Sequence, residues 1–276
     1  MVRGSAIAAV LTAVLAVTAT TGASGAERPG MLGLLQAPFP CLSQQQPGAT
    51  LADAYAAQQA HNHLREASEP IAGFKAGLTT AALQQRFQSD GPVFGVLFRY
   101  GERTPNVGIA LRDFRNAKLE TEIGFLVTEA ITAPLADVAA LRRHFGYVVP
   151  VIEVPDVSFV AGCTANAVDL VAANVAAWRH IRGKPVVWAD LPALSTIGVQ
   201  LRRDGTLIAS GETNAVQPSV EASLLQLVNT ALAQGYAIEP GQLFITGALS
   251  GLIDAAPGEH VADFGALGLI RFPVTP

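Results

Sequence analysis

The stretch Lys118-Leu119-Glu120-Thr121-Glu122-Ile123-Gly124-Phe125-Leu126-Val127 alternates between two kinds of side chain. A period of two is that of a β-strand, in which successive side chains point to opposite faces. One face therefore carries Leu119, Thr121, Ile123, Phe125 and Val127, and the other carries Glu120, Glu122 and Gly124. The two carboxylates share a face about 7 Å apart along the strand, where they repel each other unless water or a cation separates them.

An isolated Glu-x-Glu is most often the exposed polar face of an edge strand, because glutamate is rarely buried. A third acid, Glu153, changes this interpretation. It lies in the run 147–154, which is apolar enough to be buried on both faces. An ionised carboxylate there costs several kcal/mol unless a cation or hydrogen bonds compensate.

Three carboxylates on adjacent strands would form a site for a hard cation, either Mg²⁺ or Mn²⁺, with positions left open for substrate and water. Zinc is less favoured, because no Cys/His pair has the spacing of zinc ligands. His61 and His63 are two residues apart in a predicted helix and face apart.

Lys75 is the second unusual charge, because it lies in the small, apolar segment Ala72-Gly73-Phe74-Lys75-Ala76-Gly77-Leu78-Thr79. An isolated lysine of this kind is by default a strand residue whose ammonium group reaches out to water. Beside a metal ion and an anionic substrate, a lysine instead stabilises an enolate or moves a proton. The residues alone leave both interpretations open.

Strands outnumber helices in the remaining sequence and do not alternate with them regularly, which predicts a mixed, strand-dominated α+β fold. Predicted strands cover residues 93–98, 119–128, 147–154, 186–188, 197–202, 206–210, 243–246 and 269–274, and predicted helices cover 50–67, 136–145, 165–181 and 219–234. Asp204-Gly205 predicts a tight hairpin turn. We expect one catalytic domain at residues 50–276, preceded by a linker or loosely packed arm at 27–49.

Residues 1–26 have the pattern of an export signal. Arg3 supplies a positive charge, Ala6 to Ala19 form an apolar run, and Ser24-Gly25-Ala26 offers the small residues that a signal peptidase cleaves. A membrane anchor is the alternative, but the run is shorter than the roughly 18 to 20 residues that span a bilayer. We therefore expect an exported protein, periplasmic or secreted, that has no membrane segment after cleavage.

Cys41 and Cys163 are the two cysteines of the chain, and an oxidising compartment would permit them to pair. Two separate buried thiols are the alternative, and the sequence does not decide between them. Only 14% of the residues are charged and the formal net charge is −4. No basic surface suited to phosphates is expected, which argues against a nucleic-acid partner.

A series of short motifs resembles the 2-keto-4-pentenoate hydratases and 4-oxalocrotonate decarboxylases, which belong to the fumarylacetoacetate hydrolase superfamily. The motifs occur in the family's order: Ala54-Tyr55 with Gln58, Gly73 to Thr79, Phe94-Gly95 with Leu97, Glu120 to Ile123, Val149-Pro150 with Glu153-Val154, Gly241, Thr246-Gly247-Ala248, Pro257-Gly258 and Leu267-Gly268. The similarity covers about Leu51 to Phe272.

The resemblance implies a mixed β-roll or sandwich core with flanking helices, as in the C-terminal domain of fumarylacetoacetase. It implies a Mg²⁺ or Mn²⁺ held by Glu120, Glu122 and Glu153, with Lys75 in the active site. Thr246, Phe94 and Gly95 are implied to bind the substrate, a small 2-oxo or 2-hydroxy acid, and relatives commonly form homo-oligomers.

Several positions depart from the family pattern. Val93 replaces an acid that hydratases carry, Asp156-Val157-Ser158 replaces Asp-Ser-Arg, and Gly241-Gln242 replaces Gly-Asp. Ala172-Ala173-Asn174 replaces Ala-Asp-Asn, although Asp169 nearby remains another candidate site residue.

Hydration of 2-hydroxypenta-2,4-dienoate is the leading functional hypothesis, slightly ahead of decarboxylation of a 2-oxo-3-enedioate. Hydrolysis of an acylpyruvate ranks lower. A non-catalytic exported binder of keto acids is a further alternative, which the departures at Val93 and Ala173 suggest.

Overall fold

The computed structural model describes residues 37–191 and 193–276, and residues 38–276 form one compact unit. The predicted signal at 1–26 and the beginning of the predicted arm lie outside the described residues. None of the described helices combines the length and the apolar character that a bilayer crossing requires.

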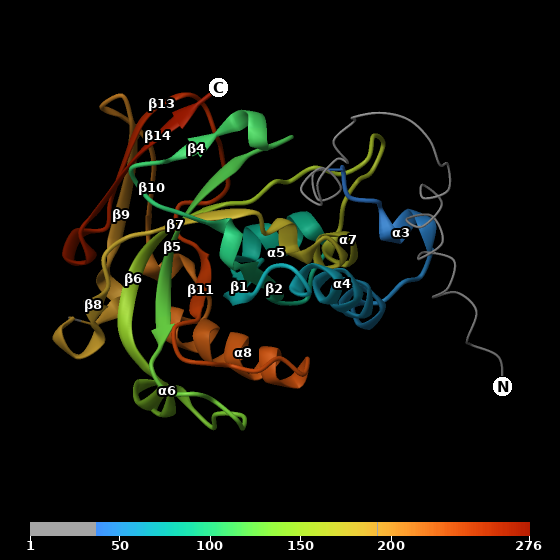
Figure 1. Cartoon of the computed structure of the whole chain (residues 1–276), viewed down its shortest axis with the longest axis horizontal. Coiled ribbons are helices and arrows are strands. Elements are labelled where there is room, and N and C mark those ends of the chain that lie inside the picture. Colours follow the sequence, from blue (N-terminus) through green and yellow to red (C-terminus); the bar gives the residue numbers. More distant parts are fainter. Residues whose placement is uncertain (1–36, 192) are drawn as a thin grey trace, which may run out of the picture. The chain divides into compact units, whose positions relative to one another are not determined.

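Two β-sheets form the core of this unit (Figure 1). The larger sheet has the strand order β2-β1-β11-β5-β6-β7-β3, with β8 paired to β6 and β12 paired to β5. These strands are β1 (Ile71–Gly77), β2 (Val93–Phe98), β3 (Glu102–Arg103), β5 (Lys118–Val127), β6 (Phe145–Val154), β7 (Arg179–Arg182), β8 (Val186–Val187), β11 (Leu243–Ala248) and β12 (Ile253–Asp254).

The smaller sheet has the order β10-β9-β13-β14-β4. Its strands are β4 (Ile109–Ala110), β9 (Gly198–Arg203), β10 (Thr206–Glu212), β13 (Gly258–Asp263) and β14 (Leu269–Thr275). The helices are α3 (Leu42–Gln45), α4 (Leu51–Glu66), α5 (Ala81–Phe87), α6 (Val138–His144), α7 (Ala167–Ala172) and α8 (Val220–Ala233).

The main hydrophobic core joins one face of the larger sheet to the smaller sheet and to α8. Phe125 from β5, Leu224 from α8 and Phe272 from β14 all belong to it and are fully buried. A second apolar cluster, which includes Ala54 and Val171, packs α4 against α7. The opposite face of the larger sheet carries only a small apolar cluster and is the face on which the charged residues gather.

Helices α4 and α8 begin where the sequence signals place them. The side chain of Thr50 accepts a hydrogen bond from the amide of Asp53, and the Asp53 carboxylate accepts one in return, so a capping box starts α4. Ser219 caps α8, because its side chain accepts a hydrogen bond from the amide of Ala222. The predicted hairpin is confirmed, because Asp204 and Gly205 both have positive φ between the antiparallel strands β9 and β10.

The predicted helix over residues 165–181 is wrong in its second half. α7 ends at Ala172, a short 3-10 turn covers Asn174–Ala176, and the chain then forms β7. The apolar spacing of this segment fits a helix, but residues 179–182 pair with β6 and extend the sheet. Tertiary pairing therefore overrides the local pattern.

The part of the predicted arm that the structure describes is attached to the rest of the unit near Cys41. Cys41 and Leu42 are buried, and Cys41 forms a disulfide with Cys163. α3 follows directly, and Phe39 pairs with Phe159 as an isolated β-bridge. The pairing of the two cysteines, which the sequence leaves open, is thus present.

Candidate metal centre

Strand register brings the three carboxylates together. Glu120 on β5 lies directly opposite Glu153 on β6, and Glu122 follows two residues later on the same face of β5. One carboxylate oxygen from each residue lies within 4.8 Å of the other two. β5 is an interior strand, and the three side chains are 8%, 1% and 0% exposed in sequence order. The alternative of an exposed edge strand is therefore wrong.

Lys75 lies on the same face of the sheet. It is in register with Ile245 on β11, which is in turn in register with Gly124 on β5. Its Nζ donates hydrogen bonds to Glu153 Oε1 and Oε2, at 2.5 and 2.6 Å, and to the Val175 carbonyl oxygen at 3.2 Å. The lysine is 3% exposed, so it is an interior charge and not a surface one.

Gly95 gives Lys75 the space that it occupies. A Cβ at Gly95 would lie 3.0 Å from Lys75 Cγ and 3.0 Å from the Asn174 carbonyl oxygen. A side chain at this position would press on the lysine chain and on the turn at 174–176, which both lie close over β2. Gly95 thus shapes the site through the absence of a side chain.

The electrostatics of the cluster show a deficit of positive charge. Burial raises the pKa of Glu120 to about 8, with Lys75 acting against this shift and Glu153 adding to it. Burial, followed by repulsion from Glu153 and Glu120, raises the pKa of Glu122 well above its ordinary value. Burial lowers the pKa of Lys75, but attraction to the three glutamates outweighs it and the net shift is upward. One ammonium group faces three carboxylates, which leaves room for additional positive charge.

The donor set fits a hard divalent cation. Carboxylate oxygens are the ligands that Mg²⁺ and Mn²⁺ prefer, and Glu120, Glu122 and Glu153 present them from a rigid pair of strands. Glu122 is further held by the backbone amide of Gly247, which donates to its Oε2 at 2.7 Å. This fixes one of the three carboxylates in place.

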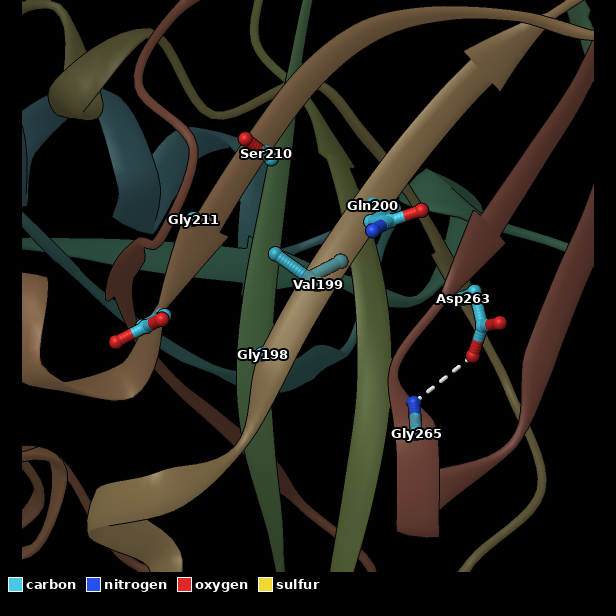
Figure 2. A pocket seen from close by; sticks show the side chains of 8 residues that line it. Gly198, Val199, Gln200, Ser210, Gly211, Asp263 and Gly265 are labelled. Carbon is cyan, nitrogen blue, oxygen red and sulfur yellow. Dashed lines mark hydrogen bonds between the residues drawn. The ribbon is translucent and has the colours of Figure 1, made fainter.

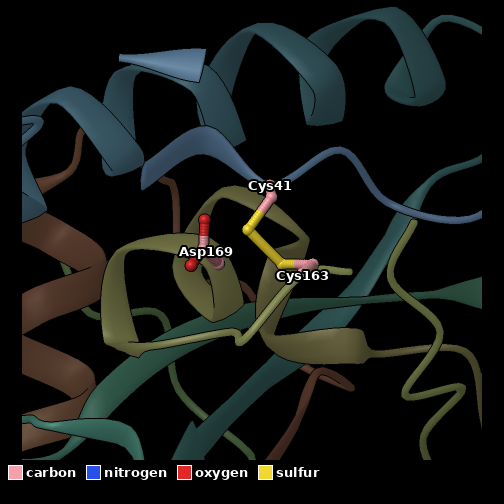
Figure 3. A group of neighbouring side chains, drawn as sticks. All are labelled: Cys41, Cys163 and Asp169. Carbon is pink, nitrogen blue, oxygen red and sulfur yellow. A yellow bond between two sulfur atoms is a disulfide. The ribbon is translucent and has the colours of Figure 1, made fainter. Parts of the chain in front are cut away.

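A second group of possible ligands is not suited to a metal ion (Figure 3). It consists of Cys41, Cys163 and Asp169. Both sulfur atoms are committed to the disulfide, so no thiolate is available to a metal. Asp169 accepts hydrogen bonds from Ser43 N and Oγ, both at 2.8 Å, and from Asn166 N at 3.0 Å. Asp169 therefore caps α7 and binds α3, and it lies in a cluster separate from the three glutamates.

Phe94 is placed differently from the expectation that it contacts substrate. It alternates with Gly95 and faces the opposite side of β2, where its ring lies 5.5 Å from the rings of Phe74 and Tyr236. Thr246 is fully buried, and its Oγ1 donates to the Ile123 carbonyl oxygen at 3.0 Å. Its hydroxyl thus already has a backbone partner at the junction of β5 and β11.

Two residues of β7 that sequence reasoning missed lie on the carboxylate face. His180 is in register with Glu153, and Arg182 is in register with Val151, which faces Glu122. Burial, and then the charges of Arg182, Arg103 and Arg179, lower the pKa of His180 to about 3. The Arg182 guanidinium contacts Glu102 at 3.1 Å and is one-third exposed. Their alternation would have revealed them had residues 179–182 been predicted as a strand.

A cleft of about 550 Å³ lies elsewhere, over the outer face of the smaller sheet (Figure 2). It is lined by Gly198, Val199, Gln200, Ser210, Gly211, Glu212, Asp263 and Gly265. It is open and carries no lysine or histidine, and one of its acids, Asp263, accepts a hydrogen bond from Gly265 N at 2.9 Å. The chemistry of the Glu–Lys cluster, not the size of a cleft, identifies the candidate site.

Comparison with known proteins gives relatives along most of the chain, although no family model matches it. A 2-keto-4-pentenoate hydratase of Burkholderia vietnamiensis is 30% identical over 235 residues, which are 83% of this chain and 88% of that protein. A 4-oxalocrotonate decarboxylase of Pseudomonas sp. strain CF600 is 27% identical over 226 residues, covering 81% of this chain and 84% of that protein.

Solved structures confirm the predicted α+β fold. A 4-oxalocrotonate decarboxylase from Pseudomonas putida G7, complexed with magnesium and adipate, superimposes with a TM-score of 0.80 at 23% identity, covering 91% of this chain and 100% of that one. A fumarylacetoacetate hydrolase family protein from Yersinia pestis CO92 gives a TM-score of 0.56 at 11% identity, covering 75% and 94%. The described strands and helices are thus those of the fumarylacetoacetate hydrolase fold.

Proposed function

This chain belongs to the family of 2-keto-4-pentenoate hydratases and 4-oxalocrotonate decarboxylases, and from that premise we propose that it is a divalent-metal-dependent lyase acting on short 2-oxo acids. One observation carries the proposal: three buried carboxylates and a buried lysine share one face of the sheet. The relatives carry the names of enzymes, which gives no support to a non-catalytic binder.

Glu120, Glu122 and Glu153 are the proposed ligands of a Mg²⁺ or Mn²⁺ ion. A divalent cation there would act as a Lewis acid that polarises the 2-oxo group and stabilises the negative charge that develops when a bond at C3 changes. The magnesium in the similar decarboxylase structure supports a divalent cation in this fold. The oxygen donor set suits both Mg²⁺ and Mn²⁺.

Lys75 is the proposed proton-transfer group. Its Nζ lies on the carboxylate face of the sheet and donates hydrogen bonds to the Glu153 carboxylate and to the Val175 carbonyl oxygen. Because the surrounding side chains exclude water, a proton on Nζ is available to a bound carbanion and is not exchanged freely with solvent. The hydrogen bonds to Glu153 and to the Val175 carbonyl oxygen fix the position of Nζ beside the proposed ligands.

Hydration of 2-hydroxypenta-2,4-dienoate is the proposed reaction. Purified protein with Mg²⁺ should remove the dienol absorbance of this compound, and a chelator should stop the reaction. Glu122→Gln keeps the size of the side chain but removes a charged ligand, so we expect a loss of at least about 100-fold in rate. Equal rates for wild type and Glu122→Gln would refute the proposal that Glu122 acts through a cation.

Decarboxylation of a 2-oxo-3-enedioate is the second candidate, and two observations favour it. Val93 stands where hydratases carry an acid, and its side chain is buried in the apolar cluster beneath α4 and α7. Arg182 lies on the carboxylate face with part of its guanidinium exposed, where it could bind the second carboxylate of a dicarboxylic substrate.

The two reactions are distinguished by assaying both substrates on one preparation. If the dicarboxylate is the substrate, Arg182→Gln should raise its KM by roughly 10-fold or more, since a charge-assisted hydrogen bond is lost. The rate with the monocarboxylic dienoate should not change. An unchanged KM for the dicarboxylate would argue against decarboxylation supported by Arg182.

Export from the cytoplasm is the proposed location. The signal-like sequence of residues 1–26 motivates the proposal, and the Cys41–Cys163 disulfide supports it because such bonds persist in oxidising compartments. Cell fractionation and sequencing of the mature N-terminus should find the protein outside the cytoplasm and beginning at Glu27. A cytoplasmic protein that begins at Met1 would refute it.

A further inference from the structure

Thr79 carries a buried hydroxyl for which the rest of the described chain supplies no hydrogen-bond partner. The residue is 1% exposed, and its Oγ1 is unpaired among the described residues. Its backbone carbonyl, by contrast, accepts a hydrogen bond from Gln217 N at 3.1 Å. An unpaired buried hydroxyl destabilises a fold relative to a methyl group of the same shape, so it calls for an explanation.

This hydroxyl lies against the residue that holds a proposed metal ligand. A Cβ built on Gly247 would lie 2.0 Å from Thr79 Oγ1, so the hydroxyl occupies the space that a side chain at 247 would need. The amide of Gly247 donates to Glu122 Oε2 at 2.7 Å. Gly247 has φ +111°, a conformation suited to glycine, which permits both contacts at once.

The chain path also ties Thr79 to Lys75. Thr79 follows β1 after Leu78, whose φ of 56° turns the chain at the end of the strand. Thr79 therefore lies four positions after Lys75, and its hydroxyl lies against Gly247, whose amide binds Glu122. A Cβ at the intervening Gly77 would meet the Val175 side chain at 2.5 Å, so the segment is packed tightly and not displaced from the site.

Neighbouring hydroxyls in this region are all paired, which sets Thr79 apart. Thr121 Oγ1 lies 2.8 Å from Ser250 Oγ, and Ser223 Oγ donates to the Thr246 carbonyl oxygen at 2.9 Å. Thr246 Oγ1 donates to Ile123 O at 3.0 Å. These hydroxyls form hydrogen bonds within the described chain, whereas the Thr79 hydroxyl forms none.

We propose that Thr79 is a substrate-binding residue whose hydroxyl donates a hydrogen bond to a carboxylate or oxo oxygen of the 2-oxo acid. The inference rests on the proposed function, because it assumes that such an acid binds beside Glu122. The carboxylate and the 2-oxo group of such an acid bring several acceptor oxygens, which match a free donor. The three carboxylates are the proposed ligands of the cation, and the neutral hydroxyl can donate a hydrogen bond to the substrate.

The first test is thermal unfolding without metal or ligand. Thr79→Val keeps the shape and removes the hydroxyl, so the melting temperature should stay equal or rise. Thr121→Val is the matched control: it is equally buried and close in sequence to the ligands, but it loses a hydrogen bond, so its melting temperature should fall. A fall for Thr79→Val as large as that of the control would overturn the proposal.

The second test is calorimetric binding of oxalate in the presence of Mg²⁺. Thr79→Val should bind oxalate roughly 10- to 100-fold more weakly, which corresponds to the loss of one hydrogen bond to a charged group. Thr79→Ser, which keeps the hydroxyl, should stay within about threefold of wild type. In turnover assays the Val variant should show a raised KM.

The outcomes distinguish a failure of the proposed role of Thr79 from a failure of the proposed function. Wild-type affinity for oxalate in Thr79→Val would overturn the role of Thr79 and leave the proposed function standing. Wild-type protein that binds no oxalate with either Mg²⁺ or Mn²⁺ would overturn the proposed function and the inference with it. Weaker binding in Thr79→Val, restored in Thr79→Ser, together with an undiminished melting temperature, supports the proposal.

Discussion

Glu120 and Glu122 are held in an interior where neither carboxylate stays ionised without help. Burial raises both pKa values, and the single ammonium group of Lys75 is bonded to Glu153 instead. A protein gains nothing in stability from three adjacent buried acids, since each costs desolvation energy. The presence of three acids on one face is therefore better explained by the binding of a cation than by a contribution to folding.

The raised pKa of Glu120 predicts that cation affinity depends on pH. Below about 8 this carboxyl is largely protonated in the cation-free protein, so a proton must leave before the ligand can bind. The Kd for Mg²⁺ should therefore decrease as pH rises from 6 to 8. Calorimetry at several pH values measures it, and an affinity that does not change with pH would contradict the prediction.

The raised pKa of Glu120 also predicts how the stability of the metal-free protein changes with pH. The folded protein binds a proton at Glu120 more tightly than the unfolded chain, whose value is about 4.5, so stability falls as pH rises from about 4.5 to 8. Glu120→Gln cannot titrate, and it serves as the control for both measurements. Its unfolding free energy should decline less over this range than that of wild type.

At the scale of elements, α7 connects the N-terminal segment to the site. The Cys41–Cys163 disulfide joins the start of α3 to the segment before α7 (Figure 3). Hydrogen bonds from Ser43 to Asp169 connect the two helices directly. α7 leads directly into the turn Asn174–Ala176, where Val175 accepts a hydrogen bond from Lys75. The disulfide is thus linked through one short helix to Lys75, the proposed proton-transfer residue.

Removal of this disulfide should destabilise the protein. The two cysteines are 122 residues apart, so the bond closes a long loop and restricts the unfolded chain strongly. The double variant Cys41→Ser/Cys163→Ser should lose about 2 to 4 kcal/mol in unfolding free energy, measured by denaturant titration. Reduced wild type should match it, and an unchanged unfolding midpoint in both would contradict the prediction.

The strand that carries the Glu-x-Glu was predictable from the sequence, because its alternation of apolar and acidic residues is local. The pairing of β5 with β11 was not, since its register depends on residues more than a hundred positions away. The prediction of a helix over residues 165–181 was wrong for a similar reason. Its apolar spacing fits a helix, but pairing with β6 makes residues 179–182 a strand.

The polar residues of the early motifs have a role that the sequence could not reveal. β2 lies at the end of the sheet, and its outer backbone groups lack a neighbouring strand. Tyr55 Oη accepts from Phe94 N, Gln58 Nε2 donates to Phe94 O, and the Asn174 amide bonds both backbone groups of Val96. These side chains take the place of a strand and support Gly95 beside Lys75.

At the scale of the whole molecule, the site exists only when four strands are in register. Lys75, Glu122, Glu153 and Gly247 come from β1, β5, β6 and β11, which are spread over most of the chain. The order of the motifs along the sequence could predict which residues gather. It could not predict that Phe94 faces away, that Asp169 belongs to another cluster or that Thr79 is left unpaired, because these are facts of packing.

Since the cation would join strands from the whole sheet, its binding should raise the melting temperature of the entire domain. A ligand present at 100 times its Kd stabilises the folded state by about 2.7 kcal/mol, which for a domain of this size is roughly 5–10 °C. Mg²⁺ or Mn²⁺ should produce this rise in scanning calorimetry, and a chelator should reverse it. Glu122→Gln removes a proposed ligand and replaces a buried acid with a neutral amide, so it should melt no lower than metal-free wild type and gain little from the cation. A rise equal to that of wild type in this variant would show that the stabilising ion binds elsewhere.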